Sequence, residues 1–181
     1  MKWKPGDVVL TFGSAGWWPP RRWVLWVVYK AIRAFQKKKW GEGNVDYRVT
    51  HVRIFLNGQL FEATMPKCKW TSFIEAKLWK KEHKVMRWSG PKRLNIPAMN
   101  KEATKLNGTK YDWGDLLDFP LGVRVFGDRL KKFKVCSTAV AQILQAGGAT
   151  FDGTISNVDP AYFLASQNAA EWDLVKWEQK P

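Results

Sequence analysis

The sequence has few of the residues that build metal sites and disulfide frameworks. Its 181 residues include two cysteines, Cys68 and Cys136, and two histidines, His51 and His83. Two cysteines cannot form a framework of several disulfides, and the four residues show none of the spacings of a zinc site. We therefore expect no structural metal.

Long apolar runs are also missing. Trp23 to Tyr29 is the longest strongly apolar run, and Lys30 ends it far short of the ~20 residues that a membrane-spanning helix needs. Near the N-terminus, Val8 to Phe12 is too short for the apolar region of a signal peptide. We therefore expect a cytoplasmic protein, although a phage-associated protein or one delivered by a non-Sec route would have the same features.

Acidic residues are scarce relative to basic ones. Thirty Lys and Arg against sixteen Asp and Glu give a formal net charge of +14, which favours anionic partners such as nucleic acid, acidic lipid or cell-wall polymer. There are also twelve tryptophans, several of them in one basic stretch. Trp beside Lys and Arg suits a membrane interface, sugar stacking or base stacking equally well. No repeat or linker divides the chain, so we predict one domain over residues 1–181, with a Trp-rich basic helical insertion at about 17–40.

A β-hairpin is the most informative local prediction. Two strand-like runs, Arg48–Leu56 and Gln59–Met65, flank Asn57-Gly58, which is a strong signal for a tight type I′ turn. Such a turn pairs Ile54 with Phe61 and continues to His51 opposite Thr64. The side chains then alternate between two faces. The apolar face carries Val52, Ile54, Phe61 and Ala63, and the polar face carries His51, Arg53, Glu62 and Thr64.

This register makes His51 and Glu62 diagonal neighbours across the hairpin. Their backbones would lie ~7–8 Å apart, a gap that the two side chains can close. Glu62 has a second interpretation as the ion-pair partner of Arg53, which lies directly opposite.

Cys136 is predicted to lie in the first turn of a helix with an apolar stripe, which Gly147-Gly148 ends. The N-terminus of a helix and a nearby imidazolium both stabilise a thiolate. Cys136, His51 and Glu62 would thus supply a nucleophile, a base and a group that orients the base. The alternative is that Cys136 is a small buried apolar residue, as a lone cysteine in a helix usually is. Cys68, in a Lys-flanked loop, and His83, at the end of a basic helix, are predicted to be surface residues without a role.

The remaining predictions concern regular elements outside the hairpin and the Cys136 helix. They are strands over Asp7–Phe12 and Lys84–Trp88, and helices over Trp23–Lys38, Ser72 to about Glu82, Asn95–Asn107 and Asp159 to about Ala165.

Six short motifs in the order of this chain resemble the YiiX-like branch of the NlpC-type papain-like cysteine hydrolases. The motifs are Gly6-Asp7-Val8-Val9, Thr50-His51-Val52, Phe61-Glu62-Ala63, Gly108-Thr109-Lys110-Tyr111-Asp112, Cys136-Ser137-Thr138-Ala139-Val140 and Asp159-Pro160-Ala161. That branch is circularly permuted, so that the histidine precedes the cysteine, and it is similar to the lecithin retinol acyltransferase group. The resemblance extends from Gly6 to about Ala165.

The resemblance implies an α+β, permuted papain-like fold in which a small antiparallel sheet packs against the Cys136 helix. It implies Cys136 as the nucleophile, His51 as the general base and then acid, and Glu62 as the residue that orients the imidazole. The backbone N–H of Cys136 would contribute to an oxyanion hole. Tyr111 would bind the oxyanion or the substrate, although a long basic segment, Arg124–Lys134, separates it from Cys136.

The predicted function is that of a cysteine hydrolase that cleaves an amide or related acyl bond through a thioester on Cys136, without a metal or organic cofactor. Its substrate would be a peptidoglycan peptide or an acyl-lipid. Two alternatives stay open: a lipid acyltransferase that uses the same Cys/His pair, and a non-catalytic basic module that binds an anionic polymer or membrane surface. We expect no specific nucleic-acid partner, and the sequence predicts no oligomeric state.

Overall fold

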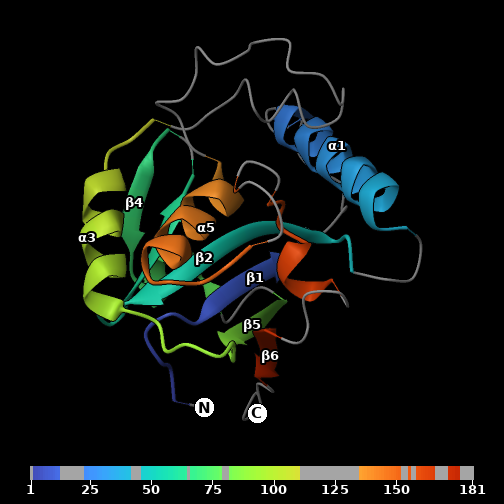
Figure 1. Cartoon of the computed structure of the whole chain (residues 1–181). Helices are drawn as coiled ribbons and strands as arrows, with labels where there is room; N and C mark the ends of the chain where they lie inside the picture. Colours follow the sequence, from blue (N-terminus) through green and yellow to red (C-terminus); the bar gives the residue numbers. More distant parts are fainter. Residues whose placement is uncertain are drawn as a thin grey trace.

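A six-stranded antiparallel sheet forms the centre of the protein, in the strand order β4-β3-β2-β1-β5-β6 (Figure 1). The computed structural model describes residues 2–12, 23–41, 46–64, 66–78, 82–110, 135–151, 155, 158–165 and 171–175. The strands are β1 (Val8–Phe12), β2 (Val49–Leu56), β3 (Gln59–Ala63), β4 (Cys68–Thr71), β5 (His83–Trp88) and β6 (Trp172–Val175). The helices are α1 (Trp23–Trp40), α2 (Phe73–Ala76), α3 (Ile96–Leu106), α5 (Cys136–Ala146) and the short 3-10 helix η5 (Tyr162–Leu164). The predicted α+β class with an antiparallel sheet is therefore confirmed.

Successive side chains of each strand point to opposite faces of the sheet. Apolar side chains are buried on both of these faces. On one face, Leu10, Ile54 and Phe61 pack with residues of α3 and α5 in the main apolar core. On the other face, Val9 and Leu60 belong to a smaller core that α2 helps to close. The helix that begins with Cys136 thus covers one face of the central strands, as Figure 1 shows for α5 lying over β2.

The predicted hairpin is present, but its two strands separate early. Asn57 and Gly58 have φ values of 48° and 77°, the two positive angles that a type I′ turn requires. The pairing runs from Leu56–Gln59 to Ile54–Phe61 in the predicted register and then stops. The predicted outer pairs, from Arg53–Glu62 to His51–Thr64, are therefore not part of this ladder. Beyond Ile54, β2 continues alongside β1, whereas the end of β3 pairs with β4.

The Cys136 helix is confirmed at both ends. Val135 is the N-cap residue, and the first helical hydrogen bond runs from Ala139 N–H to the Val135 carbonyl. The helix ends at Ala146, and Gly148 follows in the left-handed region at a φ of 94°. Glycine adopts that conformation without steric cost, which is why Gly147-Gly148 stops the helix.

Within the predicted insertion at 17–40, the structure describes α1, and Asp159 anchors the end of this helix. Lys39 Nζ lies 2.8 Å and Trp40 Nε1 3.0 Å from Asp159 Oδ2. The Asp159 side chain is buried, so these contacts fix the last turn of α1 onto the segment that precedes η5. The buried Gln36 of α1 also donates a hydrogen bond of 3.2 Å from its Nε2 to the Val49 carbonyl, so α1 contacts the start of β2 as well. No helix in the described part of the chain is both long and apolar enough to cross a bilayer.

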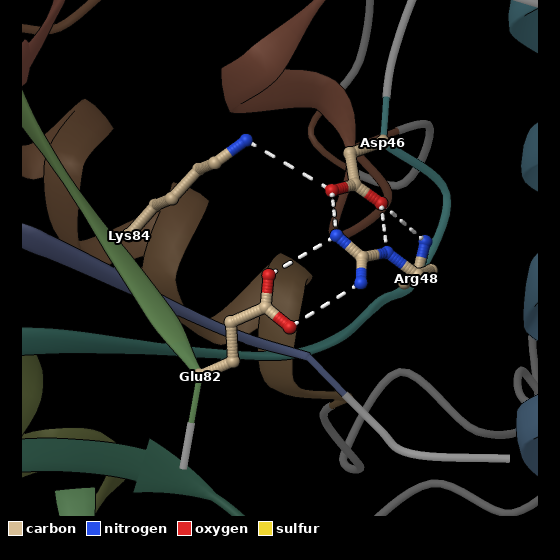
Figure 2. A network of polar contacts seen from close by, with 4 residues as sticks. All are labelled: Asp46, Arg48, Glu82 and Lys84. Carbon is tan, nitrogen blue, oxygen red and sulfur yellow. Dashed lines mark hydrogen bonds and ion pairs between the residues drawn. The ribbon is translucent and has the colours of Figure 1, made fainter. Parts of the chain in front are cut away.

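An exposed ion-pair network connects the beginning of β2 to the beginning of β5 (Figure 2). Arg48 Nη2 lies 2.8 Å from Asp46 Oδ2 and 3.1 Å from Glu82 Oε1, and Lys84 Nζ lies 3.9 Å from Asp46 Oδ2. The Arg48 and Glu82 side chains are 53% and 57% exposed, so each pair contributes at most about 1 kcal/mol to stability.

Four local predictions need correction. Cys68 is fully buried in β4 rather than exposed in a loop, and His83 begins β5 rather than ending a helix. The capping box of Ser72 and Glu75 is present, but α2 ends at Ala76 because Lys77 turns into the left-handed region at a φ of 50°. The helix predicted after Asp159 is only the 3-10 turn η5.

Candidate active site

The site is built first on the contact between His51 of β2 and Glu62 of β3. His51 Nε2 lies 2.8 Å from Glu62 Oε2. The side chains are 19% and 6% exposed, so the contact lies at the edge of the interior and reaches solvent on the histidine side. The diagonal contact predicted from the hairpin register is present, even though the backbone ladder ends before it.

Glu62 is held by two further side chains. Its Oε1 accepts a hydrogen bond of 2.8 Å from Thr71 Oγ1 of β4, and Arg53 Nε lies 2.7 Å from Oε2. The ion pair with Arg53 and the contact with His51 therefore exist together and share one carboxylate oxygen. Burial raises the pKa of Glu62, but the bond to His51, the charges of His51 and Arg53 and the Thr71 hydroxyl outweigh it and hold this pKa far below its ordinary value. Glu62 is thus a fixed anion.

The sulfur of Cys136 reaches His51 at the point where β2 and β3 separate. In a continued hairpin the N–H of Val52 would face β3 and pair with Ala63. The ladder stops first, and this N–H instead donates to the Cys136 sulfur, as does the N–H of Ser137. The opening between the strands therefore lets a helix on one face of the sheet meet a side chain from the other.

The surroundings of Cys136 favour its thiolate. Burial raises the pKa of this thiol, but the charge of His51, the hydrogen bond to it and the two backbone N–H donors bring the pKa below its ordinary value. The sulfur also lies at the positive end of α5, which stabilises a negative charge.

The same contacts favour the protonated form of His51. Burial and the charge of Arg53 lower its pKa, but Cys136 and Glu62 outweigh them, and the pKa lies above its ordinary value. Since Glu62 contacts Nε2, Nδ1 is the ring nitrogen left for the sulfur. Both nitrogens carry a proton in the imidazolium, so one ring can donate to the carboxylate and to the thiolate together.

Of the predicted site residues, Cys136, His51 and Glu62 lie together, whereas Tyr111 falls outside the described residues, as does the Arg124–Lys134 segment. The sequence did not assign Thr71 to the site, because β4 itself was not predicted. Among the residues that the structure describes, no His, Cys, Asp and Glu side chains gather in a group of three that could hold a metal ion.

Comparison with known proteins adds no relative to this picture. None of the protein-family models matches the chain, and a search of curated proteins found no match to its sequence.

Proposed function

We propose that the protein is a cysteine hydrolase that cleaves an amide or a related acyl bond through a thioester on Cys136. One observation carries the proposal: the Cys136 sulfur contacts the ring of His51, whose Nε2 is held 2.8 Å from the buried Glu62 carboxylate. A nucleophile, a base and a group that orients the base are the parts that covalent acyl transfer requires.

The acylation half of the reaction begins with the thiolate of Cys136 and the imidazolium of His51. The sulfur attacks the carbonyl carbon of the substrate, and the carbonyl electrons move to the oxygen. The N–H of Cys136 precedes the first helical hydrogen bond and would stabilise this oxyanion. When the intermediate collapses, the bond to the leaving group breaks, and His51 gives that group its proton. The acyl group then remains on Cys136 as a thioester.

Deacylation reverses these roles with water. The neutral His51 accepts a proton from water as the oxygen attacks the thioester carbon, and collapse of the second intermediate expels the Cys136 thiolate. The carboxylic acid leaves, and the thiolate and imidazolium are restored. Glu62 keeps the ring in one orientation throughout, and its charge favours the imidazolium in the first half.

The substrate class that fits best is an acyl compound with anionic character, either a peptidoglycan peptide or an acyl-lipid. The net charge of +14 would raise the local concentration of such a substrate. The mechanism uses no metal and no organic cofactor.

The test is intact-mass spectrometry after incubation with muropeptides and, in parallel, with phospholipid vesicles. We expect an added acyl mass on the wild type and on Cys68→Ala, the matched control at the other cysteine, and none on Cys136→Ala. Hydrolytic activity in folded Cys136→Ala would overturn the proposal. A product formed with an added amine in place of water would identify an acyltransferase. Salt-sensitive binding without any adduct would instead support the binding module.

A further inference from the structure

The contacts around Glu62 give Arg53 a role that reaches beyond holding the sheet together. Arg53 Nε and His51 Nε2 lie 2.7 Å and 2.8 Å from the same atom, Glu62 Oε2. Two nitrogens that contact one oxygen lie within ~6 Å of each other, a range in which one cation strongly opposes the protonation of another.

Arg53 is fixed in this position from a third strand. Its Nη1 donates a hydrogen bond of 3.1 Å to Thr11 Oγ1 of β1, and its side chain is only 7% exposed. The Nε–H is not aligned for a hydrogen bond to Glu62. Arg53 therefore acts on the carboxylate mainly through its charge, at a place where water screens that charge little.

The proposed chemistry sets opposite demands on His51. A buried carboxylate with a single cationic neighbour would hold the imidazolium proton firmly, which favours the Cys136 thiolate but hinders transfer of that proton to a leaving group. A second cation on the same oxygen weakens this hold.

We propose that Arg53 is a positioning residue that limits the proton affinity of His51 by sharing the Glu62 carboxylate with it. The inference rests on the proposed role of His51 as acid and base. Other charged groups near this pair are Cys136 on α5, Lys69 opposite Glu62 on β4, and Glu75 on α2. Lys69 and Glu75 are exposed and stay unchanged in every variant below.

The test is an NMR titration of the histidine ring C–H signals. The chain has two histidines, so His83→Gln assigns the two signals without further labelling. We expect Arg53→Gln to raise the pKa of His51 by about one pH unit, and Arg53→Lys, which keeps the charge, to leave it within about 0.3 of a unit of the wild-type value. An unchanged or lower pKa in folded Arg53→Gln would overturn the proposal, because a purely structural role would let Glu62 move away and the imidazolium lose its partner.

A second comparison does not depend on the folding of the single variant Arg53→Gln. Glu62→Gln and the double variant Glu62→Gln/Arg53→Gln differ only at Arg53, and the double variant leaves no buried charge of the pair without a partner. We expect a higher pKa of His51 in the double variant than in Glu62→Gln, and equal values would contradict the proposal. Both titrations need no substrate, so they separate a failure of this inference from a failure of the proposed hydrolase activity.

Discussion

Replacing Glu62 with Gln should destabilise the protein far more than the loss of one hydrogen bond would. The carboxylate is 6% exposed and lies 2.7 Å from Arg53, which is 7% exposed. Glutamine has nearly the same shape but no charge, so Arg53 would stay buried as an unpaired cation. Removing one partner of a buried ion pair typically costs about 3–5 kcal/mol, and burial leaves little solvent screening to reduce this figure. We expect a loss of about 3 kcal/mol in the free energy of unfolding at pH 6.

The pH dependence of this loss has a defined sign. Glu62 has a folded-state pKa below its ordinary value of 4.5, so its contribution is complete above pH 4.5 and declines as the pH falls towards the folded-state value. His51 has a raised pKa, so the part due to its imidazolium is complete below its ordinary value of 6.5 and declines as the pH rises through the raised value. The difference between wild type and Glu62→Gln should therefore be largest between about pH 4.5 and 6.5.

Urea unfolding at a series of pH values measures this difference. Glu82→Gln is the matched control, because Glu82 also pairs with an arginine but in an exposed network (Figure 2). Its loss should stay below about 1 kcal/mol. A Glu62→Gln loss no larger than that of the control would refute the assignment of Glu62 as a fixed buried anion.

Three further substitutions test the hairpin turn, the contact at the end of α1 and the N-cap of α3. Gly58→Ala should cost about 1 kcal/mol in urea unfolding, because alanine is strained at a φ of 77°, although the space around it is open. Asp159→Ala should remove one partner of Lys39 and one of Trp40 and speed amide hydrogen exchange in the last turn of α1, with little change in β1–β3. Unchanged exchange would show that Asp159 does not anchor the helix. Asn95→Ala should cost about 1 kcal/mol in thermal or urea unfolding, because Asn95 caps α3 through its side chain.

The parts of the fold that were predicted correctly are those that depend on residues close together in the sequence. The Asn57-Gly58 turn sets the hairpin register, and that register brings His51 towards Glu62. The end of α5 follows in the same way from Gly147-Gly148. These features need only turn chemistry and side-chain periodicity.

Features that depend on distant partners were not predicted. The strand β4 is short, and its sequence, Cys68–Thr71, has no clear alternation, so its pairing with β3 decides its structure. Thr71 was therefore missed as a partner of Glu62. The early separation of β2 and β3, which frees the Val52 N–H for the sulfur, occurs where the N-terminus of α5 meets the sheet. No local pattern in the hairpin encodes it.

The activation of Cys136 by His51 can be measured directly by alkylation with iodoacetamide at pH 6, followed by peptide mapping. Cys136 and Cys68 are 4% and 0% exposed, so a difference in exposure would make neither thiol react much faster than the other. A thiolate at Cys136 predicts alkylation at least about tenfold faster there than at Cys68, and loss of this advantage in His51→Gln. Equal rates at the two cysteines, or a Cys136 rate that His51→Gln leaves unchanged, would contradict the account.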